Sequence, residues 1–124
     1  MNWFTTTTDP RLFRCCDRPE CDAPQPSGPL LDGLNRLRER LGRPIIVTSG
    51  PRCKVHNAEV GGADGSDHLV GNGADLEAPT SRDRWHLIAA NFEAQTLFRR
   101  LGVGKTFVHV GVGSTPDVIW TYYL

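Results

Sequence analysis

The residues best suited to chemistry lie in one glycine-rich stretch, residues 66–75, where a histidine and an aspartate are seven positions apart. On a helix, His68 and Asp75 would lie two turns or about 10 Å apart, which is too far to share a metal ion with bonds of about 2 Å. On one straight strand the separation would exceed about 20 Å. The two side chains can therefore meet only if the chain folds back at Gly71-Asn72-Gly73, a sequence suited to turns with positive φ.

A third residue could complete a metal site with this pair. Imidazole nitrogens and carboxylate oxygens are ordinary zinc ligands, and a catalytic zinc needs three protein ligands and a fourth position for water. His109 is the expected third ligand, because it points away from the valine side of an alternating strand. In the alternative reading, His68 is a loop histidine and His109 is a hydrogen-bonded core histidine. The residues taken singly leave both readings open.

The order of several short motifs resembles a known family. The motifs are SGPRC, HNAEVGG, SDHLVGNGADLE, FVHV and IWTY, and the likeness spans residues 30–122. Together they resemble the zinc D-Ala-D-Ala carboxypeptidase and L-Ala-D-Glu endopeptidase family, which shares its fold with the hedgehog signalling domain. The resemblance implies that His68, Asp75 and His109 bind Zn²⁺ and that the target is the stem peptide of bacterial peptidoglycan.

The same resemblance implies roles for two further residues. The family places an arginine after a Ser-Gly turn, here Arg52, whose guanidinium would hold a substrate carbonyl or carboxylate and stabilise an oxyanion. Ser66 would hydrogen-bond substrate. Pro51 stands where relatives usually carry an aromatic residue, so the pocket beside Arg52 is expected to differ from theirs.

The proton acceptor that such hydrolysis needs departs from the family pattern. Relatives carry an acid three residues before the last histidine or an aspartate two residues after it, and these positions are Thr106 and Gly111 here. Glu77 is the first substitute, because on a strand it would share a face with Asp75 at a distance of about 7 Å. Asp67 is the second. The alternative for Glu77 is an exposed carboxylate at the end of a strand.

Four cysteines suggest a second structural feature. They are Cys15, Cys16, Cys21 and Cys53. Short members of the family often carry an N-terminal cysteine cluster and another cysteine directly after the arginine. By that likeness, a disulfide or a structural zinc that joins Cys16 or Cys21 to Cys53 would tie the arm of residues 1–29 to the loop of Arg52. Four cysteines allow three disulfide connectivities, and the sequence does not choose among them.

The elements around these motifs predict an α+β fold with a small, mostly antiparallel sheet and two main helices, like the hedgehog/DD-peptidase fold. Ser27 as a cap and leucines at helical spacing predict the first helix, which Gly42 closes. A strand is expected at 45–47 and a short helix at 55–60.

The second main helix begins at a capping box formed by Thr80 and Asp83. An apolar stripe predicts that it faces the core and continues to Gly102. The stripe consists of Trp85, Ile88, Phe92, Phe98 and Leu101. Residues 107–112 alternate as a strand, and a turn at 114–117 followed by residues 118–123 predicts a C-terminal hairpin.

Composition bounds the class of protein. The 124 residues fit one domain, 1–124, and Lys plus Arg equals Asp plus Glu at 14 each, so the basic surface of a nucleic-acid binder is not expected. No stretch approaches the roughly 18 to 20 apolar residues of a membrane span, and no export signal is recognised. The protein is therefore expected to be made in the cytoplasm and to reach the cell wall through phage lysis or virion delivery.

These observations favour a zinc metallopeptidase that cuts peptidoglycan stem peptides, as a carboxypeptidase or endopeptidase, for example a phage lysin with virion proteins as partners. One rival is a non-catalytic zinc-containing module that binds peptidoglycan or builds a virion. Another is a domain whose zinc is purely structural, which would unfold when the metal is removed.

Overall fold

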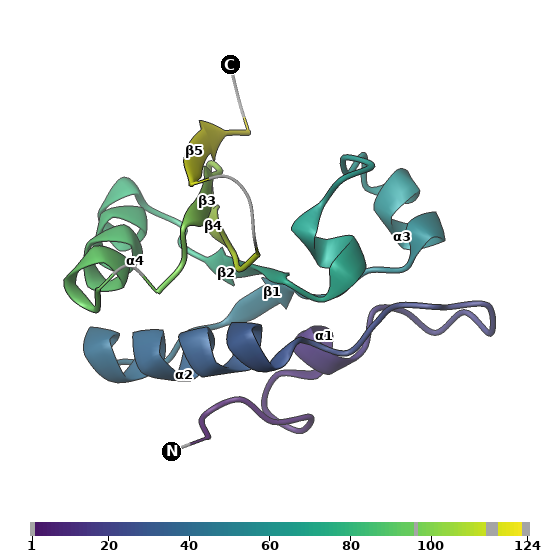
Figure 1. Ribbon diagram of the computed structural model, residues 1–124, viewed down its shortest axis with the longest axis horizontal. Helices are drawn as coiled ribbons and strands as arrows, with labels where there is room; N and C mark the ends of the chain where they lie inside the picture. Colours follow the sequence, from purple (N-terminus) through teal and green to yellow (C-terminus); the bar gives the residue numbers. More distant parts are fainter. Residues whose placement is uncertain (1, 96, 114–116, 123–124) are drawn as a thin grey trace.

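The computed structural model describes residues 2–95, 97–113 and 117–122 as a five-stranded sheet with helices on both faces (Figure 1). The strands, in the sheet order β1-β2-β4-β3-β5, are β1 (Val47–Ser49), β2 (Gly73–Glu77), β4 (Phe107–Gly111), β3 (Arg100–Val103) and β5 (Val118–Thr121). The helices are α1 (Pro10–Phe13), α2 (Gly28–Leu41), α3 (Lys54–Glu59), the 3₁₀ helix η1 (Asp67–Val70) and α4 (Ser81–Glu93). All neighbouring strands are antiparallel except β3 and β5, so the predicted α+β class is confirmed.

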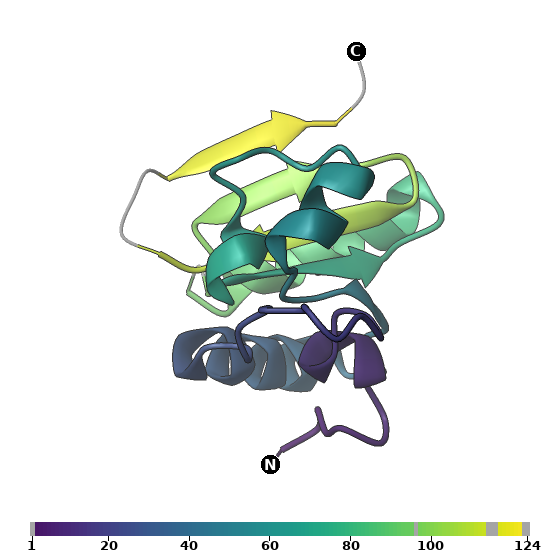
Figure 2. The same ribbon diagram turned by 90° about the vertical axis from the view of Figure 1, so that its right-hand side faces the viewer.

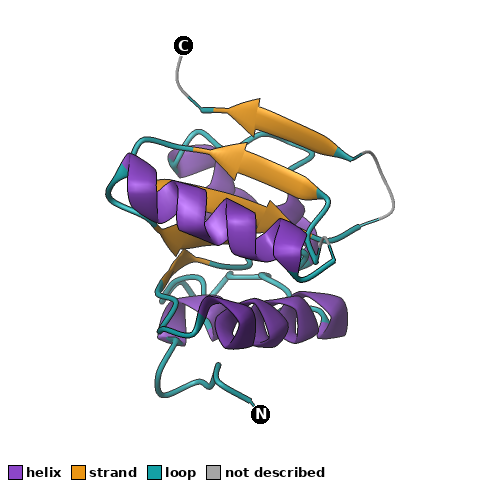
Figure 3. Ribbon diagram, turned by 90° about the vertical axis from the view of Figure 1, so that its left-hand side faces the viewer, coloured by secondary structure: helices purple, strands orange, loops and turns teal. Residues whose placement is uncertain are grey.

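The helices divide between the two faces of the sheet. Figure 3 shows α4 in front of one face, and Figure 2 shows α3 and η1 in front of the opposite face. Helix α2 lies below the sheet beside β1 and contacts α4 (Figure 1). Among the described residues, no helix is long and apolar enough to cross a membrane.

Helix α2 forms as predicted. The Ser27 side chain accepts a hydrogen bond from the Leu30 backbone N–H at 3.2 Å, and Gly42 ends the helix with a φ of 76° that a side chain would disfavour. Leu30, Leu34 and Leu37 are fully buried. Helix α2 therefore supplies one wall of the apolar core.

Helix α4 starts as predicted but ends earlier. Thr80 and Asp83 form the capping box, yet the helix stops at Glu93 and not near Gly102. The buried side chain of Asn91 receives the returning chain: its Nδ2 donates to the Phe98 carbonyl at 2.9 Å, and its Oδ1 accepts from the Phe98 N–H at 2.7 Å. These two bonds hold Phe98 beside the helix end.

The prediction that the apolar stripe forms a single face of α4 was therefore wrong. Trp85 is 65% exposed and Phe92 is 47% exposed, whereas Phe98 is fully buried outside the helix. Leu101 belongs to β3. The helical spacing of these residues along the sequence hides a change from helix to strand.

The C-terminal hairpin was also wrong. Strand β5 pairs in parallel with β3, with Leu101 opposite Ile119, and β3 lies between β4 and β5. Residues 114–116 of the expected turn and residue 123 of the expected strand lie outside the described residues. The first strand is shifted as well, because β1 covers 47–49 instead of 45–47, while the short helix α3 lies where it was expected.

Alternation along β2 and β4 separates the core from a polar face. Val108 and Val110 on β4, with Ala74 and Leu76 on β2, are buried in the apolar cluster that α2 and α4 cover. His109 lies between the two valines in sequence and therefore points to the other face, toward α3 and η1. The sheet thus presents its polar residues to the loops that precede β2.

Candidate metal centre

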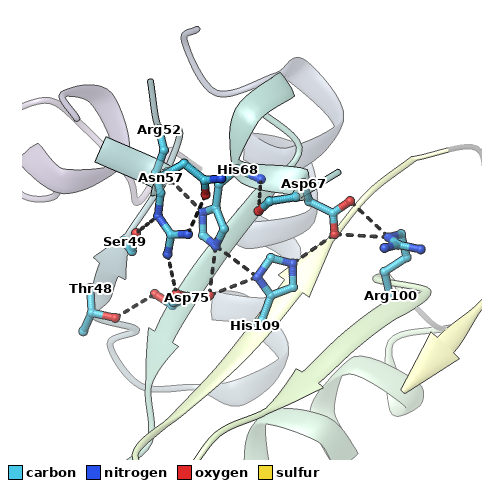
Figure 4. Close-up of polar contacts among 11 residues, drawn as sticks. Thr48, Ser49, Arg52, Asn57, Asp67, His68, Asp75, Arg100 and His109 are labelled. Carbon is cyan, nitrogen blue, oxygen red and sulfur yellow. Dashed lines mark hydrogen bonds and ion pairs between the residues drawn. The ribbon is translucent and has the colours of Figure 1, made fainter. Parts of the chain in front are cut away.

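Two predicted ligands are neighbours across adjacent strands. Asp75 on β2 is directly opposite His109 on β4, and the Asp75 Oδ1 lies 2.9 Å from the His109 Nδ1 (Figure 4). Directly opposed residues in an antiparallel pair bring their side chains together without help from other elements. The sheet register therefore fixes this half of the site.

The third predicted ligand, His68, arrives from η1. Its Nε2 lies 3.2 Å from the Asp75 Oδ1 and 3.2 Å from the His109 Nδ1. The chain folds back where the glycines predicted it, since Gly71 adopts a φ of 75° after η1. Gly73 is needed for space, because a Cβ there would lie 2.7 Å from the His109 Cε1.

Hydrogen bonds on the far side of each ring fix both imidazole tautomers. The Gly50 carbonyl lies 2.7 Å from the His68 Nδ1, and the Asp67 Oδ2 lies 3.0 Å from the His109 Nε2. A carbonyl and a carboxylate only accept hydrogen bonds, so these two ring nitrogens carry the protons. In the neutral rings, the lone pairs of the His68 Nε2 and the His109 Nδ1 therefore face Asp75.

The three facing atoms have the spacing of a metal site. A tetrahedral zinc with bonds of about 2.0 to 2.1 Å holds its ligand atoms about 3.3 Å apart. The atoms of His68, Asp75 and His109 are 2.9 to 3.2 Å apart. All three side chains are buried, and a cation between them would offset the repulsion of three lone pairs at these distances. The donor set fits zinc.

Burial and neighbouring charges oppose each other at this centre. Burial alone would raise the pKa of Asp75, but its close contacts with the imidazoles of His109 and His68 outweigh it and hold that pKa well below its usual value. Burial would lower the pKa of His109, but hydrogen bonds to Asp67 and Asp75 reverse the effect and raise it. The surroundings thus favour an anionic Asp75 beside positive charge.

Asp67 and Arg100 form the support behind His109. The Arg100 Nε lies 3.1 Å from each carboxylate oxygen of Asp67, and both side chains are largely buried (Figure 4). Burial would raise the pKa of Asp67, but its bonds to His109 and Arg100 lower it overall. The sequence suggested Asp67 as a substitute proton acceptor, and the structure places it where it orients an imidazole.

Arg52 lies on the other side of the centre. Its guanidinium donates to the Ser49 Oγ at 3.1 Å, to the Asn57 Oδ1 at 3.2 Å and to the Asp75 Oδ2 at 3.3 Å. Its backbone N–H donates to the His68 carbonyl at 2.9 Å. Arg52 therefore connects the loop after β1 to a predicted ligand.

The centre opens into a cavity of about 380 Å³. Arg52, Ser66 and the three predicted ligands line it, and aromatic side chains complete its walls. Those aromatic residues are Phe107, Trp120 and Tyr122. The ring of Trp120 lies 5.3 Å from the ring of His109, centroid to centroid. Burial, followed by the charge of Asp75, raises the pKa of Tyr122 to about 12, so its hydroxyl stays protonated at neutral pH.

Comparison with protein families agrees with this geometry. The sequence model of peptidase M15 matches residues 10–111, which is most of the chain. The chain belongs to the peptidase M15 family. Comparison with curated proteins gave no match. Members of the M15 family are zinc enzymes, and the His68, Asp75 and His109 group of this chain could hold a metal ion.

The M15 chain does not bring every predicted site residue into the cavity. Glu77 is exposed at the end of β2, and it is absent from the described residues that line the cavity, although its cross-strand partner Phe107 is among them. Ser66 does line the cavity, where its Oγ accepts from the His68 N–H at 3.2 Å as the cap of η1. The prediction that Glu77 has a catalytic role is therefore supported only by the alternation of side chains along the strand.

Sequence reasoning missed several residues of this M15 site. Asn57 holds Arg52 and donates to the Ala63 carbonyl at 3.0 Å, and it lies one position after His56 in the quoted HNAEVGG motif. Arg100 lacked a local signal, because it sits within the span read as a helix. Trp120 was quoted in the IWTY motif without a role.

Proposed function

We propose that this M15 peptidase hydrolyses a peptide bond in peptidoglycan stem peptides, as a D-Ala-D-Ala carboxypeptidase or an endopeptidase, with Zn²⁺ held by His68, Asp75 and His109. One observation carries the proposal. Three buried metal-directed atoms converge within 3.2 Å of one another at a cavity that also contains a guanidinium. The resemblance to short, phage-type members of the family favours a phage lysin or a virion component.

Zinc bound here would polarise the scissile carbonyl and lower the pKa of a bound water toward about 7. The chain's own residues hold a proton on the outer nitrogen of each imidazole, through the Gly50 carbonyl and through Asp67, and so aim the other nitrogen at the centre. Such outer partners typically change metal affinity by about 10 to 100-fold when they are removed.

Arg52 is the proposed substrate anchor. Its guanidinium lines the cavity and is held on two sides by Ser49 and Asn57. A fixed guanidinium binds a carboxylate or a carbonyl oxygen with directional hydrogen bonds. We assign it the terminal carboxylate or the carbonyl of the stem peptide, and we assign Ser66 a hydrogen bond to the peptide backbone.

Two carboxylates compete for the role of proton acceptor. Glu77 was favoured from the sequence, but it is exposed and outside the cavity lining. Asp67 lines the cavity, but its oxygens already accept from Arg100 and His109. We prefer Asp67 because it borders the cavity and a proton acceptor must come within hydrogen-bond reach of the water that it activates, although its carboxylate lies behind His109.

A second function is supported by the same observation. Both carboxylates among the described residues of the cavity lining, Asp67 and Asp75, are engaged in hydrogen bonds. A chain that lacks a free proton acceptor would keep zinc and the peptide cleft without cutting. That protein would be a zinc-containing peptidoglycan-binding module or a virion structural module.

Digestion of purified peptidoglycan tests the proposal. The protein should release new amino groups, a chelator should stop the release, and added Zn²⁺ should restore it. His68→Ala and His109→Ala should abolish both zinc binding at this centre and cleavage. His86→Ala on α4 is the matched control, because His86 lies outside the cavity lining, and it should behave as the parent. Bound zinc without any cleavage would support the binding module.

Two further variants separate the proton-acceptor candidates. Asp67→Asn should lower the rate of cleavage measured at saturating zinc by 100-fold or more, as expected for loss of a general base. Glu77→Gln should leave the rate within about twofold. The reverse pattern would return the role to Glu77.

A further inference from the structure

The four cysteines gather at a second place, at the start of α3. The sulfurs of Cys15, Cys16, Cys21 and Cys53 all lie within 4.8 Å of one another. Three belong to the N-terminal arm and one begins α3. All four are free thiols in the structure. We propose that these cysteines form a tetrahedral structural zinc site, separate from the centre at His68.

The sulfur distances fit a metal better than a disulfide. The Cys53 Sγ lies 3.8 Å from the Cys15 Sγ and 3.9 Å from the Cys16 Sγ. Four sulfurs bound to zinc at about 2.3 Å would lie about 3.8 Å apart. A disulfide needs about 2.05 Å between two sulfurs and would use only a pair of them. One sulfur with two neighbours at the edge length of a zinc tetrahedron indicates a shared ion.

Two of the sulfurs also accept a hydrogen bond from a backbone N–H, which suits thiolate ligands. The Cys53 N–H donates to the Cys15 Sγ at 3.3 Å, and the His56 N–H donates to the Cys53 Sγ at 3.4 Å. Donors to the ligand atoms hold them in place and offset their negative charge.

Burial affects the protonation of one thiol of this cluster most clearly. It raises the pKa of the Cys15 thiol to about 12, so that thiol keeps its proton in the absence of metal. A bound Zn²⁺ takes the place of such protons, since the thiolate is the ligand form. The all-sulfur donor set selects zinc over the oxygen-preferring ions, magnesium and calcium.

The location gives this site a structural task. Cys53 directly follows Arg52, whose guanidinium reaches Asp75. The arm around Cys16 and Cys21 contains no helix or strand between Phe13 and Gly28. Zinc at the four sulfurs would anchor this irregular segment to the start of α3. It would thereby fix the backbone from which Arg52 enters the cavity.

The test begins with metal content under reducing conditions. The purified protein should hold two zinc ions per chain. A His68→Ala/His109→Ala double variant should keep only the zinc at the cysteines. A Cys16→Ser/Cys21→Ser double variant should keep only the zinc at the histidine centre. One zinc in the parent that disappears entirely in the histidine variant would overturn the proposal.

A spectroscopic arm covers cysteine variants that fail to fold. Co²⁺ added to the His68→Ala/His109→Ala variant should give strong sulfur-to-cobalt charge-transfer absorption, because only the four thiolates remain to bind it in a tetrahedron. Absence of that absorption would overturn the proposal.

The disulfide alternative has its own readout. Protein prepared without reductant and then denatured should show four reactive thiols after the zinc is removed. Two or none, with the matching loss of mass, would show that the cysteines form disulfides and would reject the zinc site. Metal content, cobalt absorption and the thiol count do not depend on peptidoglycan cleavage, so the outcome is independent of the proposed peptidase activity.

Discussion

The carboxylate of Asp67 occupies the space that a side chain at Gly111 would fill. A Cβ at Gly111 would lie 2.3 Å from the Asp67 Oδ2 and 3.0 Å from its Cγ. Residue 111 is the position where the sequence resemblance places an aspartate in many short relatives. This chain therefore brings a carboxylate to the rear of His109 from η1, with glycine at 111 leaving the room for it.

An exchange of the two residues should follow from this relationship. Gly111→Asp alone should weaken zinc binding at the histidine centre by about tenfold or more, because two carboxylates would compete for one space beside His109. Asp67→Ser combined with Gly111→Asp should recover most of the loss. Competition with a chelator measures the affinities. Additive losses in the double variant would show that the two positions do not substitute for each other.

Loss of the support behind His109 should appear as a change in metal affinity. Asp67→Ala removes the acceptor that keeps the proton on the His109 Nε2, so zinc affinity should fall by about 10 to 100-fold. Titration with a zinc indicator measures it. Asp117→Ala is the matched control, since Asp117 pairs with Arg99 on the surface and should leave the affinity unchanged.

The anchor role of Arg52 predicts a loss of catalysis without a loss of zinc. Arg52→Lys keeps the charge but cannot reproduce the fork that bonds Asn57 and Asp75. The value of kcat/KM on a stem peptide should fall by about 100 to 1,000-fold, as when an oxyanion donor is removed. Zinc per chain should stay at the parental level. The exposed Arg36→Lys should retain full activity, and equal losses in both variants would contradict the assignment.

Two glycines of α2 should respond in opposite ways to alanine. A Cβ at Gly33 would lie 2.7 Å from the Phe98 Cζ, so Gly33→Ala should destabilise the fold by about 1 to 3 kcal/mol. Gly28 has open space around its Cβ position, and Gly28→Ala should be neutral or stabilise by up to about 1 kcal/mol. Urea denaturation compares them. A neutral Gly33→Ala would mean that Phe98 moves aside freely.

The buried amide of Asn91 should be costly to remove. Asn91→Ala leaves the N–H and the carbonyl of Phe98 without their partners, which should cost about 2 to 5 kcal/mol in unfolding free energy. Arg82→Ala on the exposed side of the same helix should change it by no more than about 0.5 kcal/mol. Thermal and urea unfolding of the three proteins give the comparison.

The sequence predicted best what short-range rules govern. Ser27 and Thr80 were correctly placed as helix caps, and Gly71 folds the chain back as its position between a histidine and an aspartate required. The end of α4 was missed because Phe98 and Leu101 continue a helical spacing by coincidence. Their positions depend on Asn91 and on strand pairing, which are contacts between segments that no local pattern records.

For the candidate site, too, the sequence identified the residues of a local motif and missed those defined by long-range contacts. His68, Asp75 and His109 could be chosen because their motif is specific, and the structure brings them together. Arg100 could not be chosen, because its value lies in a bond to Asp67, which is 33 positions away. Asn57 was equally hidden, since its bond to Arg52 depends on how α3 packs. Supporting residues are defined by three-dimensional neighbours more than by motif.

Strand β4 carries apolar packing on one side and an imidazole on the other. Any tilt that Val108 or Val110 undergoes within the apolar cluster is transmitted along the peptide backbone to His109, which lies between them. A larger or smaller side chain at either valine position should therefore change the coordination geometry from a distance. Turnover could be tuned from the interior of the molecule, with the surface that meets the substrate left unchanged.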